Sequence, residues 1–266
     1  MEKKDEKKKI LISLVAIAGI IILSYIIFPG NYKKTSNISE NLEVSNPIVE
    51  DSGDLRIISD IVEEEADSYI INAKYPIIEG LDNSEKEMSL NRKIKSFIDE
   101  SISDFKKQTN DGEISEEIKS GFYINFETTY LSKNLLSIKF TVSEYYAGAA
   151  HPNDYILAFN YNIADNRGIM LEEIFLPDSS YLDKLSDSSR SILFDRFEDD
   201  IEVMQDWIET GTEPEEENFE DFGIKKDSLI IYFKSYQIGP YAIGVQEIKI
   251  MFKDLDGYID LEYLGF

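Results

Sequence analysis

The chain opens with a long apolar segment. Residues 10–28 contain no charged side chain, and most of them are Ile, Leu, Val, Ala or Phe. A helix of this length spans about 28 Å, which is close to the hydrocarbon thickness of a membrane. The sequence therefore predicts a transmembrane helix at 10–28, preceded by a short tail at 1–9.

The charges on either side of this segment indicate its orientation. Five lysines precede the apolar residues, and only Lys33 and Lys34 follow closely. An excess of basic residues before the span favours a cytoplasmic N-terminus and an extracytoplasmic C-terminal part. A cleavable signal peptide would have a shorter apolar region followed by a small-x-small cleavage site, whereas Pro29 and Gly30 follow here. We therefore expect an uncleaved signal anchor.

Residues 29–66 show no sustained hydrophobic period and contain several Pro, Gly, Asn and acidic residues. Such a composition is typical of a flexible linker. A short apolar patch at 55–62 interrupts it, and this patch is either a first strand or a docking segment.

The next part of the chain, 67–150, has the pattern of an α+β module. A β-branched run at 67–78 predicts a strand, and residues 84–107 have helical periodicity. Strict alternation at 122–130 and again at 136–142 predicts an antiparallel hairpin. The apolar stripe of the expected helix consists of Ile94, Phe97, Ile98, Ile102 and Phe105.

The remainder, 151–266, is expected to form a second module. Alternation predicts a strand at 155–163, helical spacings extend from 179 to 208, and two further strands are predicted. These last strands cover 229–233 and 248–252, and the tail at 258–266 is a candidate final strand.

This order of elements favours an α+β fold with helices packed on a mostly antiparallel sheet. Neither a Gly-rich phosphate loop after a strand nor a regular βαβ alternation is present in the sequence. A nucleotide-binding Rossmann or P-loop fold is therefore not indicated.

Composition narrows the functional classes. The chain has 266 residues, of which 42% are hydrophobic and 12% aromatic, so it can bury a core. Its 27 basic and 52 acidic side chains give a formal net charge of −25, which disfavours nucleic-acid binding because phosphates are repelled.

The chain has no Cys and a single His, His151. The lack of Cys excludes disulfides, Cys-ligated zinc, a thiol nucleophile and a lipoprotein anchor, and one His excludes multi-His metal sites. We therefore expect no metal, no cofactor and no enzymatic activity. Paired carboxylates for glycoside hydrolysis stay open as an alternative, because 52 acidic residues hide any particular pair.

Two loops carry the candidate binding residues. His151 lies in the small-residue loop 147–153, where it is either a structural loop residue, a partner contact or, least expected, a catalytic base. Pro240 and Tyr241 lie between two predicted strands and are either an exposed anchor or a buried corner.

Two further tyrosines and an acidic run complete the set of candidates. Tyr145 and Tyr146 end a strand beside the His151 loop, and the same two interpretations apply to them. The run at 213–221 is either a solvated loop or an attractor for a cationic partner or Ca²⁺.

Several short motifs resemble a known family. Residues 147–153 resemble its Gly-Gly-Ala-His loop, 168–177 its "dG-x-x-L-x-x-lF" stretch, and 239–244 its Gly/Pro-Tyr-Ala-Ala-Gly loop. The family is that of exported two-module ectodomains, and it includes the lysozyme-sensing anti-sigma-V factor RsiV and the non-catalytic N-terminal region of the peptidoglycan deacetylase PdaC. Shorter matches in the first module are Tyr75, Pro76, Asn91 and Ile94.

The resemblance implies an extracytoplasmic binding or sensing module that contacts a cell-wall component or a cationic protein such as lysozyme. Its alternative is a cell-wall carbohydrate hydrolase or deacetylase that uses carboxylates. Only nine residues precede the apolar span, so we do not expect the chain itself to hold a sigma factor. A spacer or assembly subunit is a third hypothesis, and the oligomeric state is not predicted.

The apolar segment leads to a direct prediction. The full chain should fractionate with membranes, whereas a variant that begins near Asp67 should be soluble and folded, because it lacks residues 10–28. Protease added outside spheroplasts should digest the part that follows the segment. Recovery of the full chain in the soluble cytosolic fraction would contradict the anchor.

Overall fold

The computed structural model describes residues 55–110 and 118–266. The predicted transmembrane helix at 10–28, the tail before it and most of the predicted linker lie outside the described residues. Within the described ranges, no helix is long and apolar enough to cross a membrane.

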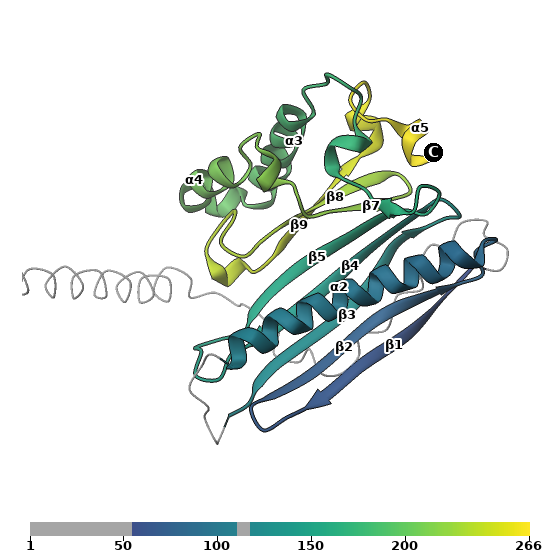
Figure 1. Ribbon diagram of the computed structural model, residues 1–266. Coiled ribbons are helices and arrows are strands. Elements are labelled where there is room, and N and C mark those ends of the chain that lie inside the picture. Colours follow the sequence, from purple (N-terminus) through teal and green to yellow (C-terminus); the bar gives the residue numbers. More distant parts are fainter. Residues whose placement is uncertain (1–54, 111–117) are drawn as a thin grey trace, which may run out of the picture. The chain divides into compact units, whose positions relative to one another are not determined.

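A six-stranded sheet forms the first layer, and its strands lie in the order of the sequence (Figure 1). All neighbouring strands are antiparallel except β2 and β3, which are parallel. A parallel pair needs a crossover connection, and the long helix α2 (Ser84–Asn110) lies between these two strands in sequence. The strands are β1 (Arg56–Glu65), β2 (Tyr69–Glu79), β3 (Ser120–Leu131), β4 (Leu135–Tyr145), β5 (Asn153–Asn162) and β6 (Arg167–Gly168).

Helix α2 lies along one face of this sheet (Figure 1). Its apolar stripe is buried as the periodicity predicts: Ile94 and Ile98 are fully buried, and the Phe105 ring stacks on Phe122 of β3 with centroids 4.9 Å apart. The helix begins where Asn83 accepts hydrogen bonds from the backbone N–H groups of Glu85 and Lys86, which is N-capping. The first module is thus one helix on one sheet.

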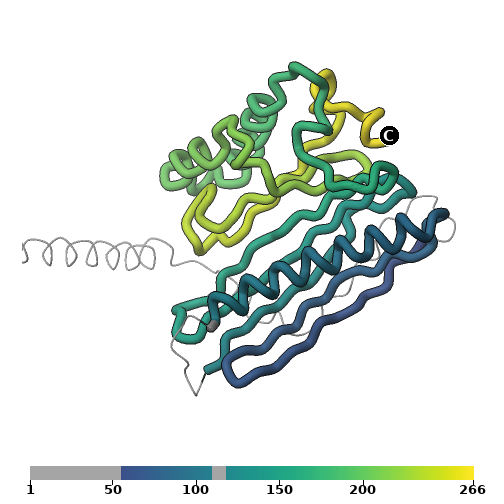
Figure 2. The backbone as a smooth tube through the Cα atoms, in the orientation of Figure 1, coloured from purple at the N-terminus to yellow at the C-terminus, as the bar shows by residue number. Residues whose placement is uncertain are grey.

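The second module is a three-stranded antiparallel sheet covered by helices, and Figure 2 shows it beside the β5 side of the larger sheet. Its helices are α3 (Tyr181–Arg196), α4 (Ile201–Gly211) and the short α5 (Leu261–Leu264), and its strands are β7 (Phe222–Lys225), β8 (Ser228–Phe233) and β9 (Gln246–Met251). Leu185, Leu193, Met204 and Ile208 bury the inner faces of α3 and α4 against the small sheet.

The expected α+β class, with helices on mostly antiparallel strands, is present, but several boundaries differ. Residues 56–65 of the expected linker form β1, so the apolar patch there is a strand. The expected tail strand is instead α5, because the Asp260 side chain accepts a hydrogen bond from the Tyr263 N–H and Gly265 ends the helix with a φ of 78°. Strand β7 was not predicted, since its four residues are too short to show a period.

The expected module boundary at 150/151 also differs from the structure. Strand β5 was assigned to the second module, yet it pairs with β4 along its whole length. One face of β5 carries Tyr155, Leu157, Phe159 and Tyr161 into the core beneath α2. The opposite face carries Ile156 and Asn160 toward the second module, so β5 belongs to both cores.

A buried polar network joins the two modules at this second face. The Ser137 hydroxyl on β4 donates to Asn160 Oδ1 at 2.7 Å and accepts from the Ile224 N–H of β7 at 2.9 Å. Asn160 Nδ2 donates to the Phe222 carbonyl, also 2.7 Å away, and Thr129 Oγ1 donates to Ser137 Oγ. Since Ser137 is fully buried, losing any member leaves unpaired polar groups in the interior.

We expect Ser137→Ala to reduce the free energy of unfolding by about 1–3 kcal/mol, because the Ile224 N–H and Asn160 Oδ1 lose their partner. Urea denaturation measures this loss. Ser143→Ala on the same strand is the matched control, and its effect should lie within about 0.5 kcal/mol. Equal stability of the two variants would show that the network does not join the modules.

Candidate functional site

Two loops from different modules meet in the structure. The His151 ring, in the loop between β4 and β5, stacks on the Tyr241 ring with centroids 4.0 Å apart. The Tyr241 hydroxyl donates to the Pro152 carbonyl at 2.6 Å, and the Tyr236 ring lies 5.6 Å from that of Tyr241. The two loops that carry the candidate binding residues therefore lie side by side. We call His151, Pro152, Tyr236 and Tyr241 the aromatic junction.

The first loop is held by backbone contacts at its start. Gly148 has a φ of 90°, a conformation that favours glycine, and the Ala149 N–H donates to the Tyr146 carbonyl to close a turn. The Ala147 N–H donates to Ser120 Oγ at the beginning of β3. These contacts carry the chain around to β5 and leave His151 exposed.

The second loop connects β8 and β9 and packs against α4. A Cβ atom at Gly239 would lie 2.6 Å from Met204 Cε of α4, so the backbone of the loop packs closely against the end of this side chain. Pro240 leads into a single 3-10 turn at Tyr241–Ile243, and Gly244 with a φ of 66° ends that turn. The loop is a rigid support for Tyr241.

Burial and charge set the properties of the Tyr241 side chain, which is half-buried. Its burial raises the pKa of the phenol, and the nearby negative charge of Asp154 raises it further. Tyr241 is therefore a neutral hydrogen-bond donor at physiological pH. Asp154 itself has one buried carboxylate oxygen without a hydrogen-bond partner in the described part of the chain.

The junction has the chemistry of a contact surface. His151 Nδ1 lies 2.9 Å from the carbonyl oxygen of the adjacent Pro152, whereas in a catalytic triad this nitrogen would donate to a carboxylate. Tyr236, which is 55% exposed, and His151 offer aromatic faces and polar edges to the solvent. Among residues 55–110 and 118–266, no group of three or more His, Asp or Glu side chains is arranged to hold a metal ion.

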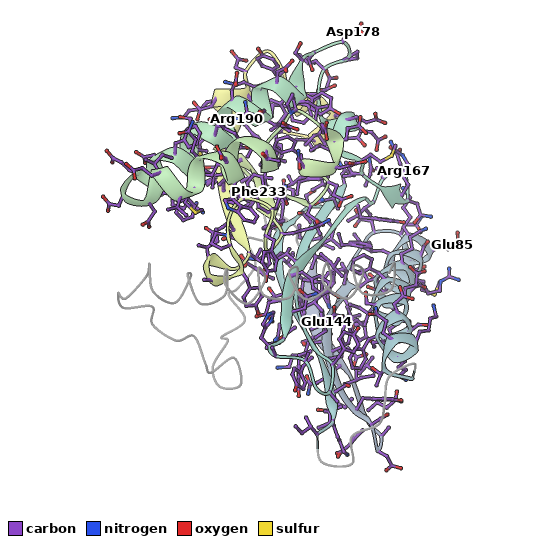
Figure 3. All side chains as sticks on the ribbon, turned by 90° about the vertical axis from the view of Figure 1, so that its left-hand side faces the viewer. Glu85, Glu144, Arg167, Asp178, Arg190 and Phe233 are labelled. Atoms are coloured by element: carbon purple, nitrogen blue, oxygen red, sulfur yellow. The ribbon has the colours of Figure 1, made fainter. Side chains whose placement is uncertain are left out.

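The other two candidate tyrosines differ from Tyr241. Tyr146 packs on Phe105 of α2 with ring centroids 5.5 Å apart, and its hydroxyl donates to Glu144. Burial, with a smaller contribution from Glu144, raises the pKa of Tyr146 to about 12. Tyr145 ends β4 opposite Gly121 and is partly exposed. Tyr146 is thus part of the packing on α2, near the end of β4 where Figure 3 labels Glu144.

The sequence did not identify Tyr236 as part of the junction. Tyr236 has a φ of 68°, which is unusual for a residue with a side chain, and this backbone conformation turns the loop toward Tyr241. The only signal in the sequence was a second Tyr shortly before the Gly-Pro pair. Sequence alone does not reveal that a residue other than Gly or Asn has a positive φ.

Comparison with known families supports the resemblance that the motifs indicate. The family model described as deacetylase PdaC matches residues 62–154, and the model described as a protein of unknown function, DUF3298, matches residues 172–253. Within the described residues, the first match covers most of the large sheet together with α2. The second covers α3, α4 and the small sheet.

Individual relatives show the same pattern. The chain is 27% identical over 262 residues to the peptidoglycan-N-acetylmuramic acid deacetylase PdaC of Bacillus subtilis, which covers 94% of this chain and 51% of the relative. It is 26% identical to the anti-sigma-V factor RsiV of B. subtilis, covering 71% of this chain and 65% of RsiV. An esterase of Mycobacterium tuberculosis is 28% identical over 39% of this chain and 43% of its own length. The chain thus spans roughly half to two thirds of these relatives.

A solved structure shares the fold. A member of the DUF3298 family from Bacteroides fragilis superposes with a TM-score of 0.56 at 20% identity, covering 78% of this chain and 94% of that chain. At this identity the similarity shows the fold alone.

The geometry of Tyr241 predicts graded effects on stability. Tyr241→Phe removes the hydrogen bond to Pro152 and should cost about 1 kcal/mol of unfolding free energy. Tyr241→Ala also removes the stack on His151 and should cost roughly 1 kcal/mol more. Chemical denaturation measures both losses, and Tyr145→Phe is a control that should change stability by less than about 0.5 kcal/mol. No loss in Tyr241→Ala would show that the two loops do not contact each other in solution.

Proposed function

We propose that this chain is a membrane-anchored, extracytoplasmic binding module of the RsiV and PdaC ectodomain type. In this proposal residues 10–28 anchor it with a cytoplasmic N-terminus, and the aromatic junction is its contact surface. The observation that carries the proposal is the stack of His151 on Tyr241, which brings loops of both modules into one exposed aromatic surface.

The relatives support the location and the class. PdaC is named for an activity on peptidoglycan, and RsiV is named as an anti-sigma factor. Both match the part of this chain that contains the two modules. A shared ectodomain linked to different outputs is what a binding or sensing module provides.

The charge of the chain supports a cationic partner. With a formal net charge of −25, the chain attracts basic proteins and repels anionic ones. Complementary charge increases the association rate, while exposed aromatic side chains supply the contact energy. A cationic protein such as lysozyme fits both requirements, and a cell-wall component is the other candidate ligand.

A carboxylate-dependent hydrolase or deacetylase is the alternative. One carboxyl supports it: Asp221 is mostly buried, and this burial raises its pKa. The Lys234 ammonium lies 3.5 Å from Asp221, and it also pairs with Glu220. This arrangement is that of an ion-pair cluster, and glycoside hydrolysis needs two carboxylates on either side of the substrate. We rank this alternative second.

The test of the proposal is a binding measurement on the full chain in a mild detergent, with chicken egg-white lysozyme and soluble peptidoglycan fragments as probes. Tyr241→Ala should weaken binding by a factor of about 10 or more, as expected for an aromatic anchor. For lysozyme, the association rate should fall steeply with added salt. Tyr123→Ala is the matched control, because Tyr123 on β3 is 43% exposed and outside the junction.

Equal affinities of the Tyr241 and Tyr123 variants would contradict the junction as the contact surface. Incubation of the same preparation with peptidoglycan distinguishes the alternative. Release of acetate or of reducing ends that disappears in Asp221→Asn would replace the binding proposal with an enzymatic one.

A further inference from the structure

Helix α4 carries a pair of exposed apolar side chains, Val203 and Trp207. Val203 is 45% and Trp207 39% exposed, and Trp207 is the single tryptophan of the chain. We propose that the outer face of α4 is a second docking surface, which binds a basic segment of another protein. This surface is separate from the aromatic junction, so the inference goes beyond the proposed function.

The periodicity of α4 places this pair beside the buried face. Met204 and Ile208 are buried against the small sheet, and they anchor the inner face of the helix. Val203 and Trp207 are four residues apart, so they are neighbours, and they lie along the border of the buried face. An exposed tryptophan beside a second apolar side chain has the composition of a binding hot spot.

All charged residues that lie close to this pair in the sequence are acidic. Residues 197–224 contain twelve acidic side chains and no Lys, Arg or His. Asp206 is three residues from Val203 and is therefore its neighbour on α4, and Glu202 lies one turn before Asp206 on the same acidic face. Both are exposed, and in the described part of the chain neither takes part in an ion pair.

The basic residues near α4 are engaged elsewhere. Arg190 of α3 donates to the Glu209 carbonyl and to Thr212 Oγ1 at the C-terminal end of α4. Arg196 donates to the Glu247 carbonyl, and Lys234 pairs with Glu220 and Asp221. The field at Val203 and Trp207 is therefore set by the acidic groups.

This combination selects the chemical class of the partner. Anionic lipid surfaces and nucleic acids are repelled by the acidic residues. A small cation would interact with the carboxylates but would gain no free energy from contact with the apolar pair. A basic amphipathic polypeptide satisfies both features, because its apolar side chains cover Val203 and Trp207 while its lysines or arginines approach Glu202 and Asp206.

The two surfaces involve different residues of α4 and its surroundings. Met204 contacts the loop that holds Tyr241, whereas Val203 and Trp207 are exposed. Helix α4 lies at the left edge of the second module in Figure 1, and this edge faces the viewer in Figure 3.

The single tryptophan gives this surface its own optical probe. The full chain in a mild detergent is titrated with a Trp-free amphipathic peptide of lysine and leucine, and Trp207 emission is recorded. We expect a blue shift, protection from acrylamide quenching and weaker binding at high salt. A peptide of glutamate and leucine of equal length should produce no change. A blue shift with chito-oligosaccharide but none with the basic peptide would overturn the proposal in favour of a glycan ligand.

Paired variants separate a specific surface from general charge attraction, with binding followed by the anisotropy of a labelled peptide. Glu202→Gln with Asp206→Asn should weaken binding about 10-fold, and so should Trp207→Ala. The matched controls on α2 are Glu85→Gln with Glu100→Gln, which removes the same charge, and Met88→Ala, which removes an exposed apolar side chain. These controls should leave the affinity unchanged.

Three outcomes would overturn the proposal. Equal weakening by the α4 and α2 charge variants would mean unspecific attraction, and an unchanged affinity in Trp207→Ala would mean that the apolar pair is not contacted. Loss of peptide binding in Tyr241→Ala but not in Trp207→Ala would assign the peptide to the aromatic junction. The last result would leave the proposed function intact, so a failure of the α4 proposal can be distinguished from a failure of the proposed function.

Discussion

Strand β5 is the element on which the arrangement of the two modules depends, because each of its faces contributes side chains to a different core. Its odd-numbered aromatic positions complete the core beneath α2, and its even-numbered positions meet the small sheet. At the centre of the second face, Ser137 and Asn160 form the hydrogen bonds that the backbone of β7 needs. Unpaired polar groups at this depth are costly, so the network fixes one register of the modules.

The aromatic junction is a consequence of that fixed register. The His151 loop leads directly into β5, and the Tyr241 loop leads into β9, whose partner β8 packs Ile230 and Tyr232 near Ile156. Lys139 adds a link, since its ammonium lies 2.6 Å from Glu247 of β9 and over the Tyr232 ring. Because contacts between the modules hold both loops, the stacked rings form a preorganised surface, which in the proposed function would reduce the entropy lost on binding a partner.

The acidic residues are distributed in a way that separates the two proposed surfaces. The aromatic junction has few charged groups, with Asp154 beside Tyr241, and its contact energy comes from the rings. The α4 face combines the exposed Val203 and Trp207 with the exposed carboxylates of Glu202 and Asp206. Two surfaces of different chemistry allow a binding module to contact one partner twice or two partners at once, which raises avidity without changing either site.

Much of the fold follows from the sequence alone, because the spacing of hydrophobic residues shows which face of a strand or helix is buried. Alternating positions located β3, β4 and β5 within a few residues, and the Ile94 to Phe105 stripe located α2, since each pattern buries one face of one element. The motifs around His151 and Tyr241 indicated both candidate loops and the resemblance to the PdaC and RsiV type. Short elements such as β7 and α5 have too few residues to show a period.

Only the tertiary structure decided which elements share a core. Strand β5 follows the expected module boundary in sequence yet completes the first sheet, because hydrogen bonds to β4 span its full length. Tyr146 and Tyr241 have the same side chain and a similar loop context, but Tyr146 packs on α2 while Tyr241 reaches Pro152 across the modules. A sequence determines which faces are apolar, whereas the partner of each face depends on contacts between distant residues, which no local pattern contains.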